Sequence, residues 1–233
     1  MTKLLLWTIL LSGIIWQDDD YSKIFGADHQ QAMEYCQTEK ETINAVTQKY
    51  KVPTNAVMSI VFPELIRYST FKNFFESTAL EYAYTKGGSK VADFSIGRFQ
   101  MKPSFAEKLE LALQTDNTLK VKYSTLIEYS TKNLQSQREK RVARLGSLNW
   151  QLIYLCGFYD LMQTKTKNIS SAEGKIKYIA TAYNCGFDKE EATILKWMKR
   201  KTFPYGAKYP ESHQYNYAEV ALDFYTNHAL DLF

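Results

Sequence analysis

Two stretches of this chain are apolar on almost every side, and they constrain the fold more than any other feature. Residues 56–62 (AVMSIVF) form the first, and Trp150 to Met162 form the second. A helix that is hydrophobic all round has to be buried inside a protein. Pro53 suits the start of the first helix. The backbone N–H groups of the first turn have no acceptor within the helix, so the N–H that proline lacks is not missed there. The two stretches therefore predict a helical protein with a core built around them.

Other segments repeat apolar residues at helical spacing. They are Met33, Cys36, Ile43, Val46 and Tyr50 in a first long helix, Ile194, Trp197 and Met198 in a later one, and Tyr217, Val220, Ala221 and Phe224 in the last. A helical pattern also resumes at Pro103, and a charged helix is expected over about 120–144. No pattern of parallel strands is present, so we predict an all-α, mainly helical fold.

Two segments carry signals of helix ends and loops. Ser170 and Glu173 fit a capping box that opens a helix running to Asn184, and Gly186 supplies a left-handed stop. Pro204-Tyr205-Gly206 predicts a turn. Residues 86–101 lose the helical period and contain several glycines, so a loop with a small hairpin is expected there.

The first residues are typical of an export signal. Lys3 precedes an apolar run over residues 4–16, and thirteen residues suit a signal peptide better than a membrane span. No small-x-small cleavage site follows, so an uncleaved N-terminal anchor is the alternative. We expect a periplasmic, cell-envelope or secreted protein that touches the membrane only through this segment, with one domain over residues 21–233.

Charge and cysteine content exclude some functions. The net charge of +4 is too weak to indicate nucleic-acid binding, although residues 120–144 carry seven Lys or Arg and residues 192–208 carry five. A solvated helix face explains such runs, and attraction to an anionic polymer such as the cell wall is the functional interpretation. Cys36, Cys156 and Cys185 are too far apart to indicate a metal site or a disulfide scaffold.

Glu64 is the first candidate for chemistry, because it is a lone acid in the apolar run 60–66. Desolvation disfavours an ionised carboxylate, so its pKa should be raised, as a general acid requires. Pro63 should kink or end the helix and direct the carboxyl into a cleft. The alternative is a partly buried glutamate paired with Arg67, one turn further on.

Two further segments offer groups for binding. In residues 92–104 (ADFSIGRFQMKPS), Gly97 could let the backbone approach a ligand, Ser95 and Gln100 offer hydrogen bonds, and Phe99 offers a stacking face. Residues 179–186 (IATAYNCG) have the form of a helix C-terminus. Each segment alone has an ordinary structural explanation.

Taken together and in this order, Glu64, residues 97–104 (GRFQMKPS) and residues 182–186 (AYNCG) resemble the lytic transglycosylase branch of the lysozyme-like superfamily. The resemblance covers about 53–187, with residues 70–90 and 120–144 as insertions and the C-terminal helices 188–233 outside it. It implies a lysozyme-like fold and cleavage of peptidoglycan glycan strands, without metal or cofactor. The family usually has serine after the catalytic glutamate, where this chain has Leu65.

The resemblance also implies roles for the residues. Glu64 would protonate the oxygen between two amino sugars and then act as a base that closes an anhydro ring on the substrate. Tyr183 would hydrogen-bond near the Glu64 carboxyl and hold it in place. The implied sugar-binding residues are Ser95, Gly97, Phe99, Gln100, Met101 and Asn184.

Asp93 leaves a hydrolytic alternative open, since glycosidases commonly use two carboxylates. It lies seven residues before Gln100 and could position a water molecule, which would make the protein a lysozyme. Otherwise it caps a turn through its own backbone. A non-catalytic protein that binds the wall or scaffolds an envelope-spanning apparatus is a further alternative. Nucleic-acid binding through 120–144 is weaker, because the export signal argues against it.

Overall fold

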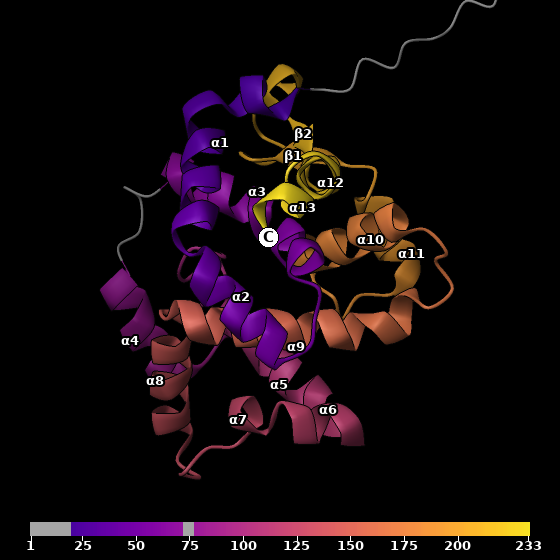
Figure 1. Ribbon diagram of the computed structural model, residues 1–233. Helices are drawn as coiled ribbons and strands as arrows, with labels where there is room; N and C mark the ends of the chain where they lie inside the picture. Colours follow the sequence, from indigo (N-terminus) through magenta and orange to yellow (C-terminus); the bar gives the residue numbers. More distant parts are fainter. Residues whose placement is uncertain (1–19, 72–76) are drawn as a thin grey trace, which may run out of the picture.

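The computed structural model describes residues 20–71 and 77–233, and within these ranges the fold is all-α, as predicted (Figure 1). The described part contains thirteen helices and one two-stranded sheet. The expectations for residues 1–16 fall outside the described residues. None of the described helices has the length and apolarity that crossing a membrane requires.

The helices, in chain order, are α1 (Tyr21–Thr38), α2 (Lys40–Lys49), α3 (Thr54–Phe71), α4 (Ser77–Gly87), α5 (Pro103–Thr115), α6 (Asn117–Lys122), α7 (Ser124–Ile127), α8 (Leu134–Leu145), α9 (Leu148–Thr166), α10 (Ala172–Cys185), α11 (Glu191–Trp197), α12 (Tyr217–Asn227) and α13 (Ala229–Leu232). The strands β1 (Lys201–Phe203) and β2 (Tyr215–Asn216) pair antiparallel. A short 3₁₀ turn, Glu211–His213, lies between the strands.

Helix α3 is surrounded by other elements, as its composition predicts. It packs against α1, α10, α12 and α13, and every residue from 56 to 66 is buried. Figure 1 shows α3 in the interior, behind α12 and α13. The second apolar stretch forms α9, which packs against α2, α5, α8 and α10, and its residues Leu152, Leu155 and Phe158 are fully buried.

The helix α3 does not end at Pro63, and the expected helix end there is wrong. It continues to Phe71 with Pro63 inside it. Proline removes one N–H donor, the one that would reach the carbonyl of Ser59 one turn earlier. One residue further on, the carbonyl of Ile60 accepts a hydrogen bond of 3.1 Å from the Tyr217 hydroxyl on α12. Packing on all sides holds the helix through the proline.

Two other predicted helices are divided. The first long helix is α1 followed by α2, with a break at Glu39 and a non-helical Gly26 inside α1. The charged segment 120–144 is not one helix but parts of α6, α7 and α8. Asn133 explains the last of these divisions, because its side chain accepts the N–H of Ser136 and α8 begins after it. Asp116 acts in the same way at the start of α6, before the charged segment.

The other residues predicted to cap a helix, end a helix or form a turn lie at or next to their predicted positions. Helix α10 is capped by Ser171, which accepts from the N–H of Gly174, instead of by Ser170. Gly186 ends α10 with a positive φ of 106°, as predicted. A turn follows β1 at Pro204-Tyr205, but the pairing of β1 with β2 was not anticipated. Helix α12 packs against both α10 and α3, so the C-terminal residues complete the core.

Two arginines of α8 are buried instead of forming part of a solvated face. Arg141 donates two hydrogen bonds to the Glu110 carboxylate, at 3.0 and 2.6 Å, and one to the Tyr84 hydroxyl. Glu110 also accepts from the hydroxyl of Tyr154. Arg144 donates to backbone carbonyls, including that of Leu126 at 2.7 Å. The basic character of residues 120–144 therefore serves partly to join α8 to α5 and to the α7 region.

Replacing Arg141 by alanine should lower the free energy of unfolding by about 3–5 kcal/mol, because Glu110 would remain as a buried charge without its partner. Urea unfolding followed by circular dichroism measures the loss. The control is Lys140→Ala, an exposed residue on the same helix, which should change stability by less than about 0.5 kcal/mol. Equal effects of the two substitutions would contradict the structural role of the Arg141–Glu110 pair.

Candidate functional site

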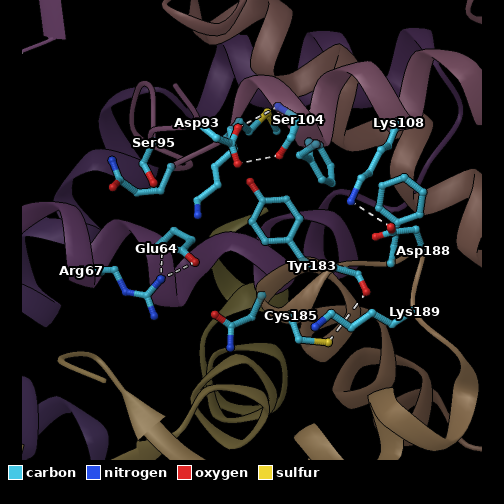
Figure 2. Close-up of a pocket in the computed structure, with 17 residues that line it drawn as sticks. Glu64, Arg67, Asp93, Ser95, Ser104, Lys108, Tyr183, Cys185, Asp188 and Lys189 are labelled. Atoms are coloured by element: carbon cyan, nitrogen blue, oxygen red, sulfur yellow. Dashed lines mark hydrogen bonds and ion pairs between the residues drawn. The ribbon is translucent and has the colours of Figure 1, made fainter. Parts of the chain in front are cut away.

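The three segments singled out in the sequence meet at one cleft with a volume of about 330 Å³ (Figure 2). Helix α3 contributes Glu64 and Arg67 to its lining. The loop before α5 and the start of that helix contribute Asp93, Ser95, Gln100, Met101, Lys102, Ser104, Phe105 and Lys108. The end of α10 and the residues after it contribute Tyr183, Asn184, Cys185, Gly186, Phe187, Asp188 and Lys189.

Glu64 is a buried carboxyl in the wall of this cleft, with only 3% of the residue exposed. Desolvation raises its pKa, and the nearby charge of Arg67 and the hydroxyl of Tyr217 act in the opposite direction without cancelling the effect. The pKa of the carboxyl is therefore raised above its ordinary value, as the sequence predicted from its apolar surroundings.

The alternative pairing with Arg67 is also present. One nitrogen of the Arg67 guanidinium, Nη1, lies 2.9 Å from both oxygens of the Glu64 carboxyl. The guanidinium stacks over the Phe203 ring, at 5.1 Å from its centroid, and over the Tyr217 ring at 5.9 Å. Glu64 is thus both a partner in an ion pair and a lining group of the cleft.

Tyr183 lies at the cleft but binds a different partner from the one expected. Its hydroxyl donates a 2.6 Å hydrogen bond to the backbone carbonyl of Phe99, so it anchors the 93–101 loop to α10. Burial raises the pKa of this hydroxyl, and the charge of Glu64 raises it further. In Figure 2 the Tyr183 ring stands between the Glu64–Arg67 pair and the Lys108–Asp188 pair. Tyr183 therefore positions the loop. Its interaction with Glu64 is electrostatic and does not involve a hydrogen bond.

Gly97 has a packing role in place of the expected approach to a ligand. Its φ is +67°, and a Cβ added there would lie 2.0 Å from Nε2 of Gln151 and 2.8 Å from the carbonyl of Leu145. Gln151, on α9, donates to the carbonyls of Ile96 and Leu145 at 2.8 Å each. The absence of a side chain at Gly97 lets the loop lie directly on α9.

Phe99 and Met101 are both buried. Phe99 is fully buried in the core, so the expected stacking face for a sugar is wrong. Met101 pairs with Ile96 through two backbone hydrogen bonds of 2.9 and 3.1 Å, which is the small hairpin expected in this loop, reduced to one bridge. Met101 also contributes to the lining of the cleft.

Besides Met101, three more of the expected sugar-binding residues line the cleft, namely Ser95, Gln100 and Asn184. Gln100 has a positive φ of 51°, which is uncommon for a residue with a side chain. Its amide nitrogen donates to the carbonyl of Gly97 at 2.8 Å and so helps to fix the turn. The strained turn holds Gln100 in the cleft wall beside the carboxyl-bearing helix.

Asp93 fastens the loop to the start of α5. One carboxylate oxygen accepts from the N–H of Ser104 at 2.9 Å, and the other accepts from the Ser104 hydroxyl at 2.7 Å. This resembles the capping alternative, although the partner is eleven residues away instead of in the adjacent backbone. Each oxygen of Asp93 accepts one of these hydrogen bonds, and the residue also lines the cleft, so the capping role and the water-positioning role remain alternatives.

Two residues of the site were missed or undervalued from the sequence. Tyr217 comes from a helix that the family resemblance does not cover, and its contact with α3 spans 157 positions of the chain. Gln151 holds the loop from within the second apolar stretch. A polar residue within such an apolar stretch was the available signal, since buried polar groups need partners.

A comparison with protein-family models finds no match, and comparisons with curated proteins and with solved structures find none either.

Substituting Gly97 by alanine should lower the free energy of unfolding by about 2 kcal/mol or more, since the new Cβ meets backbone and the left-handed φ disfavours it. Gly146→Ala is the matched control, because its φ is −76° and the nearest atom to an added Cβ is 3.6 Å away. Urea titrations of both variants test this. Equal stability of the two variants would show that Gly97 does not lie against α9.

The raised pKa of Glu64 predicts how stability depends on pH. A carboxyl whose pKa is higher in the folded state stabilises the fold fully below its unfolded value, about 4.3, and this contribution is lost as pH rises through the folded pKa. Glu64→Gln, which stays neutral, should therefore become more stable relative to the natural chain as pH rises above about 4.3. Urea unfolding between acidic and neutral pH measures the difference. A difference of opposite slope would show that Arg67 outweighs desolvation.

Proposed function

We propose that the protein cleaves the glycan strands of peptidoglycan as a lytic transglycosylase, with Glu64 as its acid and base. The observation that supports this most directly is the convergence of the three segments on one cleft, with the raised pKa of a buried carboxyl in its wall. In the sequence these segments are separated by tens of residues, and their meeting is not required by helix packing alone. Such a function requires export, which is the role proposed for residues 1–16.

In the proposed reaction the carboxyl of Glu64 acts twice, first as an acid and then as a base. The neutral carboxyl donates its proton to the oxygen that bridges two amino sugars, and the bond from that oxygen to the sugar carbon breaks. The carboxylate then removes a proton from a hydroxyl of the same sugar, whose oxygen forms a new bond to that carbon and closes an anhydro ring. Glu64 ends the cycle protonated, so no water, metal or cofactor enters the balance.

The structure supports different roles for the two neighbours of Glu64. Arg67 lies 2.9 Å from both carboxyl oxygens and stabilises the carboxylate after the first proton transfer. Tyr183 fixes the backbone at Phe99 and thereby the loop whose side chains Ser95 and Gln100 line the cleft. The sugar beside the cleaved bond would lie against that loop.

The proposal gives Glu64 both the acid and the base step, so it needs no second carboxylate. A hydrolytic enzyme uses a second carboxylate to position or activate water. Asp93 is the acid of the loop, and each of its oxygens accepts one hydrogen bond from Ser104, which ties the carboxylate to the start of α5. The mass of the products, with or without the added water, separates the two reactions.

A non-catalytic wall-binding protein is the second candidate, and the Glu64–Arg67 pair favours it. A neighbouring positive charge stabilises the ionised form of a carboxyl, which cannot donate a proton. In that case the same cleft would bind glycan without cutting it. Binding to purified walls without soluble products would support this candidate.

Digestion of purified peptidoglycan tests the proposal. The natural chain should release products that are lighter by one water than the products of a hydrolytic lysozyme, as mass spectrometry of the fragments would show. Glu64→Gln should lower the rate by about a thousandfold or more, since the loss of a general acid costs about 10²–10⁴ and here the base is lost as well.

The control is Glu41→Gln, an exposed glutamate on α2 that is remote from the cleft and should leave the rate unchanged. Circular dichroism should show both variants folded. Retained activity of Glu64→Gln would refute the assignment of the acid, and hydrolytic product masses would refute the transglycosylase reaction.

A further inference from the structure

Two histidines and one aspartate meet where α1 lies near the C-terminal end of α12. His29 lies on α1, Asp223 lies on α12, and His228 follows the end of α12. Their ligand atoms, one from each residue, all lie within 4.8 Å of one another. None of the three lines the cleft. The cluster could not be predicted from the sequence, because His29 and Asp223 are brought together only by the packing of α1 and α12 on α3.

His29 has a property that the packing of α1 does not explain. The residue is 5% exposed, and its ring nitrogen Nε2 has no hydrogen-bond partner among the described residues. A buried polar atom without a partner costs free energy, and a bound ion beside it would remove that cost.

The other two residues are arranged as the remaining ligands. Asn227 donates to Oδ1 of Asp223 at 2.8 Å and so orients this carboxylate, while Oδ2 lies 4.0 Å from Nε2 of His228. The rings of His29 and His228 are 5.5 Å apart. An oriented carboxylate beside a ligating imidazole is a common arrangement in metal sites.

We propose that His29, Asp223 and His228 bind one Zn²⁺ ion, or a similar divalent transition metal, which joins α1 to the C-terminal end of α12. Two imidazoles and one carboxylate are ligands that zinc accepts, with a water molecule in the fourth position. Donors around such an ion are about 3.4 Å apart. The ligand atoms lie within 4.8 Å of one another, so they have to approach by up to about 1.4 Å, the difference between the two distances. The side chains of Asp223 and His228 are 21% and 29% exposed and have room for this adjustment.

The role of such an ion follows from the residues at the two ends of α12. The N-terminal end of α12 bears Tyr217, whose hydroxyl contacts α3 one turn before Glu64. Its C-terminal end bears the proposed ligands. Metal binding would hold the whole helix against α1 and α3. The site does not depend on the proposed glycan cleavage and can be tested without it.

The experiment uses the full chain without a polyhistidine tag, stripped with EDTA and dialysed. Titration with ZnCl₂ in a calorimeter should show one ion per chain, and Zn²⁺ in excess should raise the melting temperature by about 5 °C. Co²⁺ should bind at the same place and give the visible absorption of a four-coordinate ion. His228→Gln and Asp223→Asn should each weaken binding at least about tenfold and abolish the thermal shift.

The chain supplies its own control, since it has three histidines and only His213 lies outside the cluster. His213 is exposed on the 3₁₀ turn, and His213→Gln should bind zinc as the natural chain does. Asp223→Asn preserves side-chain volume and provides a second, conservative test should His228→Gln destabilise the fold. Absence of binding by the natural chain, or binding that is unchanged in both cluster variants, would overturn the proposal.

Discussion

The site depends on one constraint: a carboxyl has to be held inside a helix that is otherwise apolar and buried. Glu64 can be there because Arg67, on the same helix, meets both of its oxygens, and Tyr217 lies beside it. Neither neighbour removes the effect of burial, so the carboxyl keeps a raised pKa. Two of the helices around α3 contribute to this arrangement, since α12 brings Tyr217 and α10 anchors the loop through Tyr183.

The features that the sequence predicted well are those set by local composition. The apolar stretches 56–62 and 150–162 became the buried parts of α3 and α9, because a helix without a polar face has no stable position at the surface. Gly186 ended α10 because a left-handed conformation is a property of glycine itself. The burial of Glu64 followed from its immediate neighbours in the same way.

The features that sequence reasoning missed depend on partners distant in the chain. Gly97 has the composition of a ligand-binding turn, but the space beside it is filled by Gln151, more than fifty residues later. Phe99 could have faced solvent or the core, and only the docking of the loop on α9 decides between them. The charged segment was divided before α8 by Asn133, whose side chain acts as a cap only when the following backbone turns toward it. These choices are made by tertiary contacts that local patterns do not encode.

The pairing with Arg67 favours the ionised form of the Glu64 carboxyl, whereas proton donation requires the neutral form. The two residues are one turn apart on α3, so a substrate cannot separate them by moving another element. The guanidinium also lies over the rings of Phe203 and Tyr217, and this cation–π attraction does not depend on the charge of Glu64. In the proposed reaction, Arg67 would therefore already be positioned for the carboxylate that proton donation creates. The ion pair would then contribute most in the ionised state, after the first proton transfer and before the second.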